Sequence, residues 1–174
     1  WENQVGRGKP FWRHFFPRLR ELFPEPLAAF DAASWYREVN AVRPSLIRVD
    51  ADELTYPVHI MLRYELEKRI FDGTLPVRDL PEAWRDGLDR RLGLRPANDA
   101  EGCLQDHHWA VGSFGYFPSY ALGGFISAQF YETLRNDHPE LDREIEAGRF
   151  GSLFEWLRSN VHGQGASLSS QELI

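Results

Sequence analysis

The stretch YPVHIMLRYELEKRIFDG, residues 56–73, carries the strongest structural signal in the sequence. Apolar side chains recur in it at helical spacing and predict one buried stripe: Val58, Met61, Leu62, Leu66 and Ile70. Pro57 suits the first turn, where a missing backbone N–H costs little, and Gly73 is placed to end the helix. This stretch therefore predicts a long helix against which neighbouring elements can pack.

Helical patterns continue on both sides of this stretch. They predict further helices in residues 30–42, 80–93, 120–137, 139–148 and 151–163. Only SLIRVDA, residues 45–51, alternates between apolar and polar side chains, and it predicts a short extended segment. Ile47 and Val49 would face one way, and Arg48 the other. With residues 93–119 as an irregular, glycine-rich insert, the sequence predicts a mainly α bundle.

The bulk composition describes a globular chain of one domain. It has 174 residues, of which 43% are hydrophobic and 26% charged. A formal net charge of -6 argues against binding to nucleic acid. No apolar run approaches the roughly 20 residues that a membrane span needs. The single Cys103 excludes an internal disulfide and favours a reducing, cytoplasmic compartment.

The histidines do not have the spacing of a metal site. No histidine is followed by Glu, so the His-Glu-x-x-His pattern of helical zinc sites is absent. His107 and His108 are adjacent and would point apart on a helix or strand, and Cys103 with His107 supplies only two ligands. Hydrogen bonding to the local backbone is the simpler interpretation of His107.

Arg48 lies among apolar neighbours and needs an anion if it is buried. Asp50 or Asp52 could supply that anion, which would make Arg48 structural. Alternatively, the guanidinium could bind a substrate carboxylate through two hydrogen bonds. Tyr116 and Tyr120, which lie beside glycine and proline, could either pack or present their hydroxyls to a ligand. The residues alone leave both pairs of alternatives open.

Two long motifs match patterns of one known family. IRVDAD, residues 47–52, fits Ile/Val-Arg-x-x-Ala-Asp, and GCLQDHHW, residues 102–109, fits Gly-x-x-Gln-Asp-x-His-Trp. The segments ADELTYPVHIMLRYELE and FGYFPSYALG that follow them, and the opening WENQVGRGKPFW, are similar to the same family. The chain thus resembles the thermostable zinc carboxypeptidases of peptidase family M32 over nearly its whole length.

The resemblance implies a fold, an activity and a set of site residues. The fold would be a helical bundle lining a deep groove, in a homodimer that removes single amino acids from peptide C-termini. The expected substrate-binding residues are Arg48, His108, Tyr116 and Tyr120. Either tyrosine could donate to the substrate or to the developing oxyanion. The residues expected to orient these neighbours are Gln105, Asp106 and Asp52.

The resemblance also places the metal outside this chain. The family holds its zinc with a His-Glu-x-x-His helix and the glutamate of a His-Glu-Ser-Gln block, and neither is in the sequence. Residues 1–174 are therefore expected to be the C-terminal part of a larger enzyme domain, cut at both ends, without metal ligands and inactive alone. The alternative is a non-catalytic helical module that binds peptide C-termini. Either way, the expected partner is a peptide, and not nucleic acid or a membrane.

Overall fold

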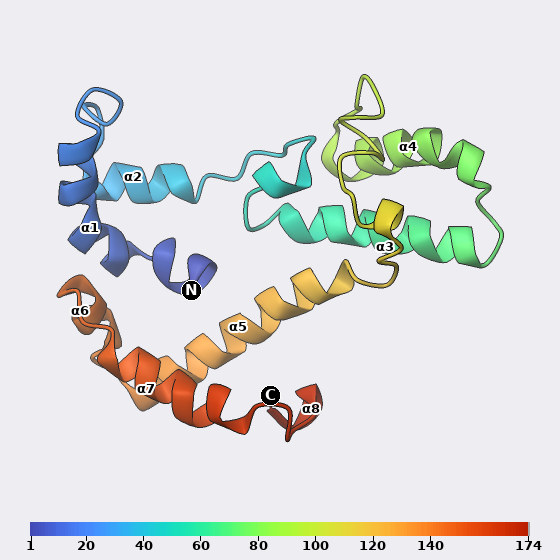
Figure 1. Cartoon of the computed structure of the whole chain (residues 1–174). Coiled ribbons are helices and arrows are strands. Elements are labelled where there is room, and N and C mark those ends of the chain that lie inside the picture. Colours follow the sequence, from blue (N-terminus) through green and yellow to red (C-terminus); the bar gives the residue numbers. More distant parts are fainter. Residues whose placement is uncertain (174) are drawn as a thin grey trace. The chain divides into compact units, whose positions relative to one another are not determined.

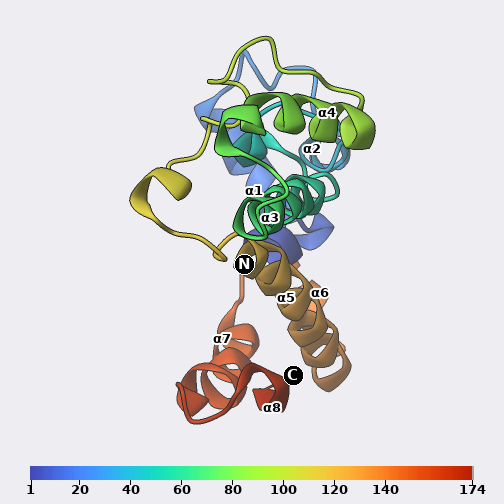
Figure 2. The same cartoon turned by 90° about the vertical axis from the view of Figure 1, so that its right-hand side faces the viewer.

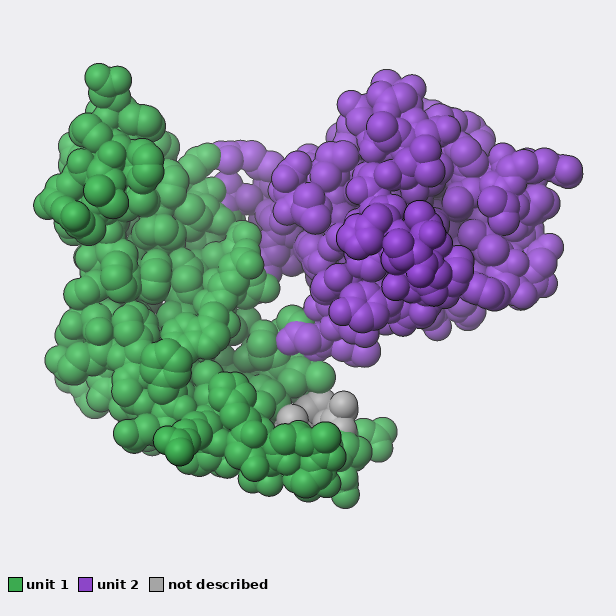
Figure 3. All heavy atoms as spheres, viewed as in Figure 1, with its two compact units in different colours: residues 1–40, 124–174 green, residues 41–123 purple. Residues whose placement is uncertain are grey.

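The computed structural model describes residues 1–173, which form helices and loops without a strand (Figure 1). The predicted mainly α fold is therefore confirmed. The chain divides into two compact units (Figure 3). Unit 1 comprises residues 1–40 and 124–174, and unit 2 comprises residues 41–123. In the described part of the chain, no helix combines the length and apolar character that a membrane span requires.

Helix α3 (Tyr56–Phe71) is the long helix of unit 2. It starts one residue before Pro57 and stops two residues before Gly73, as predicted. The predicted stripe is wrong at Met61, whose side chain is 55% exposed. The apolar residues that α3 buries are Ile60, Leu62 and Leu66.

Polar side chains take the remaining buried positions of α3. His59, Arg63 and Glu67 are 0%, 0% and 5% exposed and lie four residues apart. This spacing places them one above another along a single face of the helix. We call these three residues the polar row of α3.

Helix α4 (Leu80–Leu92) packs along α3, and the two run side by side in both views (Figures 1 and 2). Gly87 allows this close approach, because a Cβ atom there would overlap the side chain of Leu62. A left-handed Gly93 ends α4, as the sequence predicts. The helices enclose the core of unit 2, which consists of Leu62, Leu66, Leu75, Trp84, Leu88 and Cys103.

The segment before α3 differs from the prediction. Ile47 is extended, but Arg48–Asp50 form one turn of 3-10 helix, η2. Arg48 is 6% exposed, whereas Val49 is 70% exposed and Ile47 is half-buried. The predicted alternation fails because a helical turn does not place successive side chains on two opposite faces. The turn directs Arg48 inward.

Unit 1 combines both ends of the chain. Its helices are α1 (Lys9–Leu22), α2 (Ala32–Val39), α6 (Leu141–Glu146), α7 (Gly151–Asn160), α8 (Ser170–Leu173) and the larger part of α5 (Pro118–Asp137), which begins in unit 2. Helix α1 packs against α2 and α6. The core of unit 1 consists of Val5, Leu134, Leu141, Ile145 and Leu153. Short turns complete the described chain: η1 (Glu2–Gly6), η3 (Val77–Asp79), η4 (Trp109–Val111) and η5 (His162–Gln164).

Candidate functional site

Two arginines share one carboxylate inside unit 2. Arg48 donates from Nε and Nη2 to Asp106 Oδ1, at 3.1 and 2.7 Å. Arg63 donates from Nε to Asp106 Oδ2 at 2.7 Å, and its Nη2 lies 2.5 Å from the same oxygen. The side chains of Arg48, Arg63 and Asp106 are only 7%, 0% and 10% exposed. Of the alternatives left open for Arg48, pairing with Asp50 or Asp52 is therefore wrong, because Asp106 is its partner.

Gln105 ties the same two arginines to the backbone. Its Oε1 accepts hydrogen bonds from the backbone N–H of Arg48 and from Arg63 Nη2, both at 2.8 Å. Its side-chain amide donates to the carbonyl oxygens of Leu46 and Glu101, at 3.0 and 2.9 Å. These four bonds use the full hydrogen-bonding capacity of the amide. Gln105 and Asp106 thus hold both guanidinium groups in fixed positions.

The cluster remains charged at neutral pH. Burial lowers the pKa of Arg63 to about 10, although the Asp106 carboxylate opposes that shift. Burial alone would raise the pKa of Asp106, but hydrogen bonds and charge from Arg48 and Arg63 outweigh it and lower the pKa. The pKa of Arg48 is raised, because its bond to Asp106 outweighs burial. Two guanidiniums and one carboxylate therefore leave the trio with one net positive charge.

Aromatic rings surround the Arg48 guanidinium. Its central carbon lies 5.2 Å from the centre of the Tyr120 ring and 5.6 Å from the centres of the Tyr56 and Phe117 rings. Arg48 Nη1 also donates to the Tyr56 hydroxyl at 2.6 Å. Rings at this range attract a guanidinium electrostatically. Phe117 is buried but Tyr120 is 37% exposed, so Tyr120 forms the surface beside the buried charge.

His108 joins the two tyrosines of the motif region. Its Nε2 shares a hydrogen bond of 3.1 Å with the Tyr120 hydroxyl, and its ring stacks on Tyr116 at 5.8 Å. Burial lowers the pKa of His108, so the ring is neutral at pH 7. His107 is exposed and stacks on His108 at 4.8 Å. Arg48, His108, Tyr116 and Tyr120 therefore lie together in one site.

Asp52 lies outside this cluster. Its Oδ1 accepts hydrogen bonds from the backbone N–H groups of Leu54 and Thr55, and its Oδ2 accepts from the Thr55 hydroxyl and from the backbone N–H of Arg43, all at 2.9 Å. These bonds lower the pKa of Asp52, although its partial burial alone would raise it. Asp52 fixes the turn that leads into α3, so it orients the helix and not the side chain of Arg48.

Comparison with known proteins identifies the family. The family model described as Carboxypeptidase Taq (M32) metallopeptidase matches residues 1–174. The chain belongs to the M32 metallopeptidase family. This agrees with the resemblance carried by the two motifs, at residues 47–52 and 102–109.

Named M32 relatives are much longer than this chain. Carboxypeptidase 1 of Bacillus subtilis is 44% identical over all 174 residues, which cover 35% of that protein. Thermostable carboxypeptidase 1 of Thermus thermophilus is 43% identical, with 34% of its length covered. The crystal structure of M32 carboxypeptidase from Deinococcus radiodurans superposes with a TM-score of 0.94 at 44% identity, over 99% of this chain and 35% of that one. The chain thus spans about a third of its relatives.

The metal that the M32 family name implies finds no set of ligands in the described residues. Within residues 1–173, no group of three or more histidine, cysteine, aspartate and glutamate side chains could hold a metal ion. Asp106, the carboxylate of the cluster, is already shared by two arginines. His108 uses Nε2 for Tyr120. With two arginines and one carboxylate, the site in unit 2 therefore fits an anionic ligand better than a cation.

Four residues of this site were not found from the sequence: Tyr56, Arg63, Glu67 and Phe117. Arg63 and Glu67 lie in the same stretch as the predicted apolar stripe, and that stripe assigns them no role. The spacing of His59, Arg63 and Glu67 is the signal that could have revealed them. Three polar residues at intervals of four form a row that the stripe alone does not explain.

His59 predicts a pH dependence of the stability of unit 2. Burial, then the positive charge of Arg63, lowers the pKa of His59 from 6.5 to about 4. Because the unfolded chain binds this proton first, the free energy of unfolding should fall as the pH drops from 6.5 to 4, by about 3 kcal/mol. Urea titrations followed by hydrogen exchange in α3 would measure this slope. His59→Gln should flatten it and His107→Gln, at an exposed position, should not. An unchanged slope in His59→Gln would mean that His59 does not cause this pH dependence.

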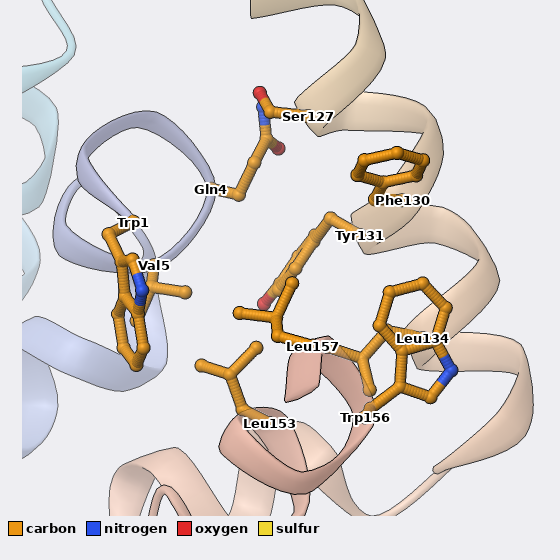
Figure 4. Close-up of a pocket in the computed structure, with 10 residues that line it drawn as sticks. All are labelled: Trp1, Gln4, Val5, Ser127, Phe130, Tyr131, Leu134, Leu153, Trp156 and Leu157. Carbon is orange, nitrogen blue, oxygen red and sulfur yellow. The ribbon is translucent and has the colours of Figure 1, made fainter. Parts of the chain in front are cut away.

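Unit 1 contains a pocket of its own, with a cavity volume of about 70 Å³. Figure 4 shows its lining, which consists of Trp1, Gln4, Val5, Ser127, Phe130, Tyr131, Leu134, Leu153, Trp156 and Leu157. The walls are mostly apolar, and the hydroxyl of Ser127 is bonded to the Gly124 carbonyl at 2.7 Å. Tyr131 has a pKa raised by burial, so its hydroxyl stays neutral. This pocket offers packing surface and few groups for chemistry.

Proposed function

We propose that this chain forms the substrate-binding part of a metal-dependent carboxypeptidase, which removes single amino acids from peptide C-termini. The observation that carries the proposal is the net positive charge of the Arg48, Arg63 and Asp106 cluster beside partly exposed tyrosines. A free C-terminus is a carboxylate, and a guanidinium binds a carboxylate with charge-assisted hydrogen bonds. Membership of the M32 family supports the class of reaction.

Arg48 has donors available for such a ligand. A guanidinium carries five N–H groups: one on Nε and two on each Nη. Within residues 1–173, the hydrogen bonds of the Arg48 side chain use one N–H each on Nε, Nη1 and Nη2. One N–H on each Nη remains for a ligand. Tyr120, whose ring centre lies 5.2 Å from the guanidinium carbon, is 37% exposed. We propose that Arg48 binds the terminal carboxylate while His108, Tyr116 and Tyr120 line the path, with a tyrosine hydroxyl donating to the substrate.

The remaining chemistry is proposed to lie in the part of the relatives' length that this chain does not span. The bound metal, zinc by family resemblance, would supply Lewis acidity when present. The described residues contribute recognition: they fix the peptide tail and present hydroxyl donors. We further propose a homodimeric parent enzyme in the cytoplasm, and a chain that is inactive alone.

Arg48→Ala in a full-length M32 enzyme carrying this sequence tests the proposal. Loss of a buried charge pair with the substrate should remove roughly 2–4 kcal/mol of transition-state stabilisation, measured as a lower kcat/KM on a peptide with a free C-terminus. On the same peptide with a C-terminal amide, the variant and the wild type should differ little. Arg78→Ala is the control, because that side chain is 84% exposed.

Equal losses on the acid and the amide would show that Arg48 is structural. A wild-type protein that binds the free acid without cleaving it would instead support the alternative of a non-catalytic module.

A further inference from the structure

Glu67 fixes the backbone immediately before Tyr116. It is 5% exposed, and its Oε1 accepts a hydrogen bond of 2.7 Å from the backbone N–H of Gly115. Gly115 has a φ of 71°, in the left-handed region that other residues rarely adopt. The carboxylate therefore holds a defined, glycine-dependent turn next to a tyrosine of the site.

Two further contacts anchor the same segment to unit 2. Phe114 packs edge-on against Phe71 of α3, with ring centres 5.1 Å apart. Phe117 is 1% exposed and lies 5.3 Å from the Arg63 guanidinium carbon. Between these anchors Tyr116 is 49% exposed. The segment is thus held at three points, with the tyrosine presented to solvent from its middle.

The polar row of α3 consequently contacts both segments that form the site, the one at Gln105 and Asp106 and the one at Gly115. Arg63 holds Gln105 and Asp106, and one turn further along Glu67 holds Gly115. Burying a carboxylate costs free energy, and a neutral apolar side chain would pack at that position at lower cost. The buried carboxylate of Glu67 is explained if its hydrogen bond to Gly115 is needed to fix the backbone next to Tyr116.

We infer that Glu67 is a positioning residue, which sets Tyr116 and its neighbour Tyr120 for contact with substrate. The inference rests on the proposed function. Tyr116 and Tyr120 are in edge-to-face contact at 5.3 Å, so displacing one ring displaces its neighbour. Glu67 acts through the Gly115 backbone and not on the substrate itself.

The test compares Glu67→Ala with Glu67→Gln in the full-length enzyme. Alanine removes the acceptor, and kcat/KM on a peptide with a free C-terminus should fall about 10-fold. Glutamine keeps an acceptor oxygen in the same place and should remain within about 3-fold of wild type. Glu65→Ala is the matched control on the same helix, because Glu65 is half exposed and pairs with Arg91.

A double-mutant cycle identifies the route of the effect. Gly115→Ala strains the left-handed turn and should by itself lower kcat/KM about 10-fold. Combined with Glu67→Ala, it should add little, because both changes release the same segment. Gly115→Ala leaves α3 unchanged, so it carries the same prediction if the Glu67→Ala protein does not fold.

The outcomes separate this inference from the proposed function. Wild-type-like activity in Glu67→Ala, equal losses in Glu67→Gln and Glu67→Ala, or additive losses in the cycle would overturn the role of Glu67. Failure of Arg48→Ala to discriminate acid from amide would overturn the proposed function, whatever the Glu67 variants do.

Discussion

Replacing Arg63 by methionine should lower the free energy of unfolding of unit 2 by about 3–5 kcal/mol. The guanidinium is 0% exposed, donates to Asp106 and Gln105, and gives its Nη1 to the His59 carbonyl at 2.9 Å. Methionine fills a similar volume, so the loss reports hydrogen bonds and charge more than packing. The carboxylate of Asp106 would keep only Arg48, and Gln105 Oε1 would lose one of its two donors.

Hydrogen exchange as a function of urea, read from peptides covering α3, measures this loss in unit 2 separately from unit 1. Arg78→Met is the control, because its pair with Asp79 is 3.7 Å long and its side chain is 84% exposed. Exposed pairs of this kind contribute about 0–1 kcal/mol. A loss below about 1 kcal/mol in Arg63→Met would mean that Arg48 alone is a sufficient partner for the Asp106 carboxylate.

The helices could be predicted from the sequence because their signals are local. Residues 80–93 contain an aligned apolar face and a terminal glycine, and α4 forms there. Helix α1 was missed, although Pro10 marks its first turn, because Pro17 inside it removes a backbone donor. Its stability comes from tertiary packing, as in the edge-to-face contact of Trp12 with Trp35 of α2.

The candidate site was only partly predictable for a related reason. Arg48 and Asp106 are 58 residues apart, and no spacing rule links them. Asp50 and Asp52 were candidates because they are close to Arg48 in sequence, but in the structure Arg48 pairs with Asp106. The resemblance brought Arg48, His108 and the tyrosines together. The polar row of α3 is visible in the sequence as a four-residue spacing, but only the structure shows that it is buried and which partners it has.

Asp106→Asn should destabilise unit 2 by about 3–5 kcal/mol at pH 7, because two buried guanidiniums lose their shared carboxylate. The amide can accept from one arginine, but its NH₂ group faces the donors of the other. Since Arg48 also loses the carboxylate that positions it, binding of a peptide with a free C-terminus should weaken in the same variant. Asp79→Asn, at a half-exposed position, is the matched control and should change neither property.

The difference in stability between wild type and Asp106→Asn should depend on pH, and this dependence tests whether its cause is electrostatic. The folded-state pKa of Asp106 is lowered below 3.8, so its contribution is present above that value and is lost as the pH falls through the folded pKa. The stability gap between wild type and Asp106→Asn should therefore stay constant from about pH 7 to 5 and narrow only below about pH 4. This range lies below the one in which His59 acts, so the two effects can be separated in one titration. A gap that closes already near pH 6 would mean that the arginines do not hold Asp106 in its charged form.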